Sequence, residues 1–299
     1  MMPSIWTGMY AELPLHNALR LLHESGWRAF EISTEHLVAI ETAQDPHRLA
    51  EVAKDCLEEL ELSAPQAHLL LQADVAAADT QERERNIKRL LRHMEISALM
   101  NAKQAVIHPG GRNSDPGSRR DGLLKLNIES FRRLGDFAGE HAMRIGIENM
   151  PWPGFAKPSE LLELLQRIDH PAIGITLDTS HANMCSLNVS DMVLAFGPHL
   201  VATHISDNNG SGDQHLTPGG GTIDWPAVMK AFRKIDYKGI FNLEIPGERH
   251  AVLGLRKLKT RYALDVATWL IEITDLKKEF LPPHATSWGQ VSAARLPDT

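Results

Sequence analysis

Five short apolar segments of this 299-residue sequence each end in a residue that can bind a metal ion. They read QAVI-His108, RIGI-Glu148, GITL-Asp178, VAT-His204 and FNL-Glu244. A short apolar run is typical of a buried strand. In a parallel α/β barrel all strands end on the same rim, so their last residues meet at one pocket. Carboxylates and imidazoles gathered there would repel one another or stay unpaired without a cation, and we therefore expect one or more divalent metal ions.

Strand-like and helix-like segments alternate along the whole sequence, as such a barrel requires. We expect strands at 4–10, 29–33, 63–71, 105–108, 144–150, 173–178, 200–206 and 240–245. Helices are expected at 15–25, 46–60, 82–100, 121–141, 160–168, 191–196, 225–235 and 255–276. Eight strand–helix units in order favour the α/β class and a single-domain (β/α)8 TIM barrel over residues 1–281, with a tail or arm at 282–299.

A doubly wound open sheet is the alternative architecture. It would not place five strand ends around one pocket. No Gly-x-Gly-x-x-Gly pattern follows the first strand, and this pattern is the fingerprint of dinucleotide binding. We therefore expect no nucleotide cofactor.

The composition excludes several classes of protein. Hydrophobic residues make up 43% of the chain and the formal net charge is −7, which gives no general attraction to nucleic acids or anionic membranes. Cys56 and Cys185 are far apart and form no Cys-x-x-Cys pair, as is typical of a reducing compartment. There is no signal peptide pattern and no membrane-spanning apolar run. These features predict a soluble cytoplasmic protein with no membrane partner.

Four of the strand-end residues form the core of the predicted metal site, namely Glu148, Asp178, His204 and Glu244. Three oxygen ligands and one imidazole suit Mn, Zn, Mg or Co. Further candidates stand nearby in the sequence, as substrate-binding residues or additional metal ligands: His68, His108, His181, Asp213 and His215. Each of these also has an ordinary structural explanation, as a hydrogen-bonded strand-end histidine or as a residue that orders a loop.

Longer motifs around these residues resemble the xylose-isomerase-like TIM barrel superfamily. They are IGIENM, LDTSHANM, FNLEIPG and HISDNNGSGDQHLTPGGGTIDW, and the resemblance covers nearly the whole chain. That superfamily holds sugar and sugar phosphate isomerases and epimerases, inosose-processing enzymes, dehydroshikimate dehydratases and endonuclease IV. In its single-metal enzymes, the resemblance implies Mn or a related ion held by the residues that match Glu148, Asp178, His204 and Glu244.

Two branches of the superfamily differ in what they imply for this chain. The three-zinc site of endonuclease IV has nine ligands, and matching residue types stand at His68, His108, Glu148, Asp178, His181, His204, Asp213, His215 and Glu244. The ketose 3-epimerase branch has a substrate-binding Glu six residues after the strand-five Glu and an Arg six residues after the strand-seven His. These positions are Gly154 and Gly210 here, so substrate recognition must differ from that branch.

The resemblance implies a metal-dependent isomerase or epimerase of a small-molecule sugar, sugar phosphate or inosose. The metal would stabilise an enediolate while Glu148 and Glu244 move a proton. A dehydratase of a keto-polyol would use the same residues, and a zinc phosphodiesterase acting on abasic DNA is the third possibility, against which the net negative charge argues.

Trp6, Trp152 and Arg249 are further candidates for the pocket wall. A homodimer and a homotetramer both fit a barrel of this kind.

Overall fold

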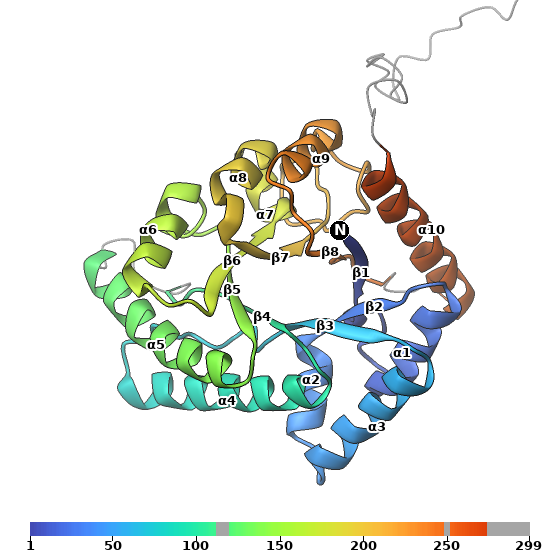
Figure 1. Ribbon diagram of the computed structural model, residues 1–299, viewed down its shortest axis with the longest axis horizontal. Coiled ribbons are helices and arrows are strands. Elements are labelled where there is room, and N and C mark those ends of the chain that lie inside the picture. Colours follow the sequence, from blue (N-terminus) through green and yellow to red (C-terminus); the bar gives the residue numbers. More distant parts are fainter. Residues whose placement is uncertain (112–119, 248–251, 274–299) are drawn as a thin grey trace, which may run out of the picture.

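Eight parallel strands form the centre of the molecule (Figure 1). The computed structural model describes residues 1–111, 120–247 and 252–273. The strands are β1 (Met2–Trp6), β2 (Ala29–Ile32), β3 (Ser63–His68), β4 (Gln104–Ile107), β5 (Arg144–Glu148), β6 (Ile173–Asp178), β7 (Leu200–His204) and β8 (Ile240–Leu243). Their order in the sheet is β7-β6-β5-β4-β3-β2-β1-β8.

The sheet closes between β7 and β8 just beyond the end of β7. Ile205 forms a parallel bridge with Leu243. The Ile205 N–H donates to the carbonyl of Asn242 at 2.7 Å, and the Glu244 N–H donates to the carbonyl of Ile205 at 3.1 Å. The nearly closed sheet, with helices between its strands, confirms the single-domain (β/α)8 barrel expected from the sequence.

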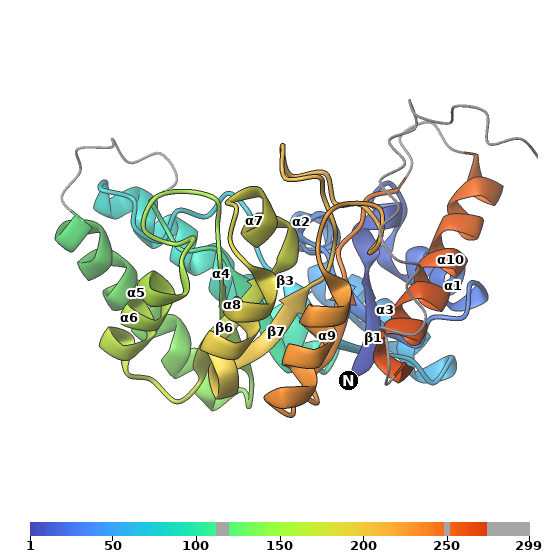
Figure 2. The same cartoon turned by 90° about the horizontal axis from the view of Figure 1, so that it is seen from above.

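Ten α-helices in the described residues surround the barrel (Figure 1). They are α1 (Leu15–Glu24), α2 (Thr34–Glu41), α3 (Pro46–Glu59), α4 (Thr80–Leu99), α5 (Arg120–Glu140), α6 (Pro158–Ile168), α7 (Thr179–Met184), α8 (Val189–Phe196), α9 (Trp225–Lys234) and α10 (Leu253–Glu272). Figure 2 shows α7 and the loop between β7 and α9 on one side of the barrel, with the N-terminus on the other. None of the helices described is long and apolar enough to cross a membrane.

The first strand is shorter than expected. The prediction of strand over 4–10 was wrong in its second half, because β1 ends at Trp6 and a 3₁₀ helix, η1 (Thr7–Tyr10), follows. The turn buries Met9 and Tyr10. It is tied to β2 by the Ser33 N–H, which donates to Thr7 Oγ1 at 2.9 Å.

The helices α2 and α7 were not expected from the sequence. Each begins directly at a strand end and is capped by the residue at that position. Ser33 accepts a hydrogen bond from the His36 N–H, and Asp178 accepts one from the His181 N–H. Such a side-chain cap satisfies one of the unpaired N–H groups of the first turn.

The barrel interior requires small residues where strands β5 and β6 pair. Gly146 lies beside Gly174 in register. A Cβ atom on Gly146 would stand 2.1 Å from Thr176 Oγ1, which no side chain allows. In this register Glu148 lies beside Thr176, and in the neighbouring β6–β7 pair Asp178 lies beside His204 at the strand ends.

Candidate metal centre

The ends of strands β5 to β8 bring four candidate ligands together. Glu148, Asp178 and His204 are the last residues of β5, β6 and β7, and Glu244 follows β8 directly. One ligand atom from each lies within 4.8 Å of all the others. His204 Nδ1 lies 3.1 Å from Glu148 Oε1 and 3.1 Å from Glu244 Oε2. The four residues therefore converge on one point at the C-terminal rim.

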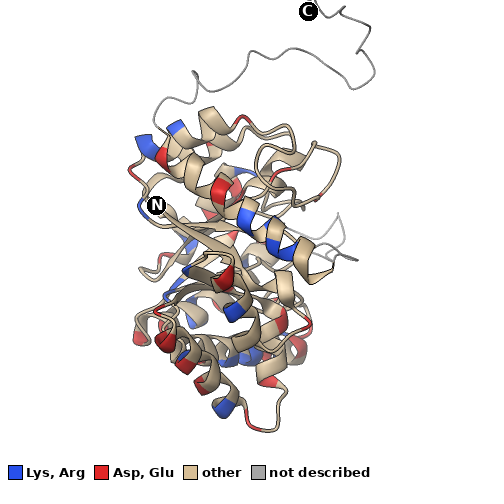
Figure 3. Ribbon diagram, turned by 90° about the vertical axis from the view of Figure 1, so that its right-hand side faces the viewer, with Lys and Arg blue, Asp and Glu red and all other residues tan. Residues whose placement is uncertain are grey.

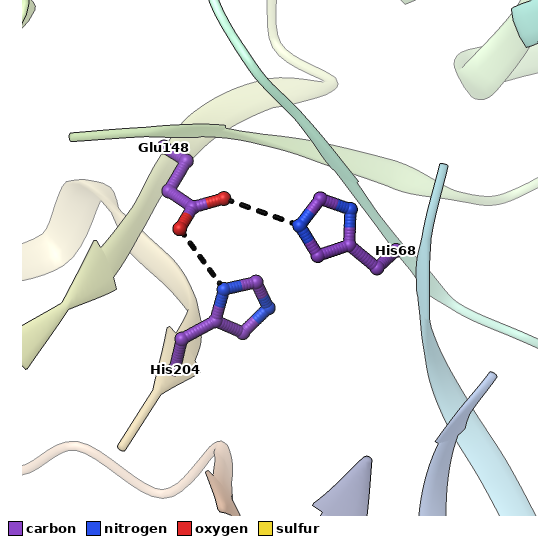
Figure 4. A group of neighbouring side chains, drawn as sticks. All are labelled: His68, Glu148 and His204. Carbon is purple, nitrogen blue, oxygen red and sulfur yellow. Dashed lines mark hydrogen bonds and ion pairs between the residues drawn. The ribbon is translucent and has the colours of Figure 1, made fainter. Parts of the chain in front are cut away.

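Two further histidines face the other oxygen of Glu148. His68 Nε2 lies 3.5 Å and His108 Nε2 lies 3.1 Å from Glu148 Oε2. His68 ends β3, and His108 follows β4. Figure 4 shows the Glu148 carboxylate between two imidazoles, with one oxygen turned to His68 and the other to His204. Glu148 is thus shared between two possible ligand groups.

A third group lies beside the other two. His181 Nε2 lies 3.4 Å from Asp213 Oδ2, and His215 Nε2 lies 3.0 Å from Asp213 Oδ1. The short helix α7 places His181 one turn after Asp178, so that its Nδ1 stands 3.4 Å from Glu148 Oε1. The structure therefore brings all nine candidate residues to one rim.

Asp207, which sequence reasoning missed, anchors the loop that carries Asp213 and His215. This buried carboxylate accepts four hydrogen bonds, from the N–H groups of Asn208, Gly219 and Ile223 and from the Trp225 indole. The Asp207 and Leu216 backbones also exchange hydrogen bonds of 2.8 Å. A buried carboxylate whose hydrogen bonds are all made fixes the loop. Its sequence signal is the Asp near the start of the motif HISDNNGSGDQHLTPGGGTIDW, together with the Trp at the end of that motif.

Three polar residues inside the barrel lie beneath His204, and sequence reasoning missed two of them, Gln66 and Asn242. Glu31 Oε1 lies 2.9 Å from His204 Nε2. Gln66 and Asn242 donate their side-chain N–H groups to Glu31 at 2.9 and 2.6 Å. A carboxylate on one ring nitrogen holds the hydrogen there and leaves the other nitrogen to bind a metal. The sequence signal for Glu31 and Asn242 is a polar residue inside an otherwise apolar strand, AFEI or IFNL.

Burial and charge act against each other at the carboxylates. Burial opposes ionisation of Glu148, but the imidazoles of His204, His108 and His181 hold its pKa well below the ordinary value. Burial raises the pKa of Asp178 to about 6. Burial also disfavours the charged form of His204, but Glu244, Glu31 and Glu148 keep its pKa well above the usual value. The clustered carboxylates thus favour a positive charge at the place where Glu148, Asp178, His204 and Glu244 meet.

The donor set fits a divalent cation. Asp178 Oδ2 is buried and accepts no hydrogen bond from the described residues. Buried polar atoms without a partner are rare and costly. Oxygen and imidazole donors that surround such atoms suit Mn, Zn, Mg or Co. The residues present could therefore hold a metal ion.

The candidate metal centre opens into a cavity of about 360 Å³. Trp6 and Trp152 contribute to its wall, together with Glu35, which sequence reasoning did not select. His181 and His215 also line it. Arg249, the remaining candidate for the pocket wall, lies outside the described residues.

Residues 19–272 match the family described as xylose isomerase-like TIM barrel. The chain belongs to this family. Among relatives, it is 25% identical over 252 residues to L-ribulose 3-epimerase from Methylomonas sp., covering 80% of this chain and 81% of the relative. It is 26% identical over 189 residues to 3-dehydroshikimate dehydratase from Pseudomonas putida, covering 56% of this chain and 29% of that protein.

Solved structures share the fold. D-psicose 3-epimerase from Clostridium cellulolyticum H10 matches with a TM-score of 0.79 at 15% identity, covering 91% of this chain and all of that chain. The curated relatives with the strongest matches are aligned over about half of their length or less, 56% for two of them and 29% for the dehydratase.

Proposed function

We propose that this protein is a divalent-metal-dependent isomerase or epimerase of a sugar, sugar phosphate or inosose. One observation carries the proposal. Glu148 and Glu244 lie at equal distances of 3.1 Å from His204 Nδ1, and both carboxylates line the same cavity. The sugar epimerases among its relatives support a substrate of this class.

A divalent cation held by Glu148, Asp178, His204 and Glu244 would polarise a substrate carbonyl and make the neighbouring C–H more acidic. The two glutamates supply the proton transfer. Burial opposes their ionisation, but nearby histidines lower the pKa of both carboxyls. One removes the proton and the other returns it, which inverts the carbon or moves the carbonyl.

The histidines at the cavity wall act as hydrogen-bond donors. Burial disfavours the charged form of His181, but Asp178, Asp213 and Glu148 keep its pKa well above the ordinary value. Burial likewise opposes the charge on His215, but Asp213 and Glu244 raise its pKa to about 10. The carboxylates thus favour the charged form of both imidazoles, which can donate to substrate oxygens or take part in the proton shuttle.

Substrate recognition must differ from that of the ketose 3-epimerase branch. Gly154 and Gly210 stand where that branch has its Glu and Arg, and their φ angles are +92° and +81°. A side chain is strained in this left-handed region, so the backbone here is suited to glycine. Glu35, Trp6 and Trp152 on the cavity wall are the residues that we assign to recognition instead.

A dehydratase is the second candidate, because the relatives include 3-dehydroshikimate dehydratase. Removal of the same proton beside a carbonyl, followed by loss of a β-hydroxyl as water, needs no further residue. A zinc phosphodiesterase is the third, and it rests on the three groups of possible ligands at the rim, two of which share Glu148 and His204.

Metal content and proton exchange test the proposal together. We expect about one equivalent of Mn, Mg, Co or Zn per chain in protein purified without chelator. With that metal, ketoses and inososes incubated in heavy water should gain deuterium beside the carbonyl, and the apoprotein should show no exchange. Two or three equivalents of zinc combined with cleavage of abasic DNA would overturn the proposal.

A further inference from the structure

The outer face of α10 carries an unusual number of exposed apolar side chains. Among the described residues, six of the ten large hydrophobic side chains that are exposed fall within residues 252–273. The other four are isolated on β1, α3, α4 and α8. Single exposed apolar residues are ordinary, but a group of them marks an interaction surface.

Four of these side chains form one stripe along α10. Leu255, Leu258, Tyr262 and Trp269 are 55%, 67%, 57% and 41% exposed. Spacings of three, four and seven residues keep them on one side of a helix, in the heptad pattern of paired helices. A different side of α10 packs against the barrel through its buried residues Thr260, Ala263, Ala267 and Leu270.

We propose that α10 packs antiparallel against α10 of a second copy of this chain, with the two-fold axis at Tyr262. The apolar residues of α10 are arranged symmetrically on both sides of Tyr262. Leu255 and Trp269 are each seven residues from Tyr262, and Leu258 and Val266 are each four residues from it. An antiparallel two-fold contact therefore sets Leu255 against Trp269, Leu258 against Val266 and Tyr262 against its own copy. Such a self-complementary patch is what a two-fold interface requires.

The charges on α10 favour the same arrangement. Its first half carries Arg256, Lys257, Lys259 and Arg261, and its second half carries Asp265 and Glu272. Within the chain Arg256 and Lys257 pair with Glu12 and Glu24, and Arg261 pairs with Asp265. Figure 3, viewed from the side on which α10 lies, shows basic and acidic bands on the helix. Antiparallel packing places each basic half against the partner's acidic half, with Lys259 opposite Asp265, because each is three residues from Tyr262. Parallel packing would set like charges together, which is unfavourable.

The oligomeric state of the full chain tests the interface. We expect a dimer by sedimentation equilibrium, and we expect Leu258→Glu to be a monomer that keeps the wild-type circular dichroism spectrum. The matched control is Leu194→Glu, an equally simple change at an exposed leucine of α8, which should stay dimeric. A monomeric wild type, or a Leu258→Glu variant that remains dimeric, would overturn the proposal.

A cross-link locates the two-fold axis. Tyr262→Cys should form a covalent dimer under mild oxidation, since residues on the axis meet their own copies. Wild type, with its native Cys56 and Cys185, and Leu194→Cys are the controls and should stay monomeric on a non-reducing gel. Absence of a covalent Tyr262→Cys dimer would overturn the proposed register. The proposal would also be overturned if the variant were a monomer and its cysteine did not react with a thiol reagent. In that case residues 274–299 of the same chain would cover the exposed face of α10.

Discussion

The Nε2 atom of His204 lies 2.9 Å from Glu31 Oε1, below the metal centre. Its Nδ1 atom points the other way, into the centre. The barrel interior thus supplies a carboxylate that orients the imidazole of a candidate metal ligand. Because Glu31 also accepts hydrogen bonds from Gln66 and Asn242, the orientation of His204 is held by three strands besides its own.

Glu31→Gln should weaken metal binding. The amide would turn an N–H group toward one of the donors that now point at Glu31, and it would remove the negative charge that faces His204 Nε2. Loss of such a contact typically costs about 10- to 100-fold in metal affinity. Calorimetric titration of the apoprotein with Mn²⁺ or Zn²⁺ measures this directly. The control is Glu35→Gln at the exposed cavity wall, for which affinity should be unchanged, and equal affinities in both variants would contradict the role of Glu31.

Glu244→Gln should remove turnover while the fold stays intact. Loss of a positioned acid–base group lowers the rate by about 10²- to 10⁴-fold. Since Glu244 is also a candidate ligand, kcat is measured with metal in excess and the bound metal is counted in the same sample. A variant with near-wild-type turnover on a confirmed substrate would show that the proton-transfer role lies elsewhere.

Asp207→Asn should disturb the loop that carries Asp213 and His215 and leave the four-residue centre in place. The asparagine amide would face N–H donors, because Asp207 now accepts from Gly219, Ile223 and Trp225. We expect a higher KM and faster amide exchange in residues 208–222, with little change in metal content.

Asp224→Asn serves as its control. Asp224 caps α9, and asparagine caps helices about as well as aspartate, so this variant should behave like wild type. If amide exchange in the loop is the same in both variants, Asp207 does not anchor it.

Glu41 on α2 provides a pH-dependent contribution to stability away from the metal centre. Arg89 and His93 on α4 contact its carboxylate at 2.6 and 3.1 Å. The hydrogen bond from Arg89 lowers the pKa of Glu41, against the effect of its burial. Because the folded pKa lies below the unfolded one, this stability is present above the unfolded pKa and is lost as the pH falls through the folded pKa.

Glu41→Gln should therefore lower the free energy of unfolding by about 1 kcal/mol at neutral pH, a small value because Arg89 is partly exposed. The difference from wild type should shrink as the solution is acidified. Urea unfolding at several pH values measures it, and Glu51→Gln, in an exposed pair with Arg48, should have almost no effect. A difference that is constant with pH would rule out the carboxylate as its source.

The elements that sequence reasoning missed are short. The helices α2 and α7 have eight and six residues, and each follows a strand with one residue or none between, so that its sequence continues the strand pattern. Their start is set by a single capping side chain, Ser33 or Asp178. A lone Ser or Asp after an apolar run is compatible with a loop as well, so only the folded backbone distinguishes the two.

Sequence alone determined the barrel and the strand-end residues of the candidate centre. Short apolar runs ending in Glu148, Asp178 or His204 are local patterns, and parallel strands carry their ends to one rim whatever the packing around them. The tertiary structure decided what supports that centre. Glu31 and Asn242, which form a hydrogen bond, are 211 residues apart in the chain. The exposed face of α10 is known only once the structure shows which side of the helix packs against the barrel. Contacts between distant segments leave no local pattern, because they exist only after the chain has closed on itself.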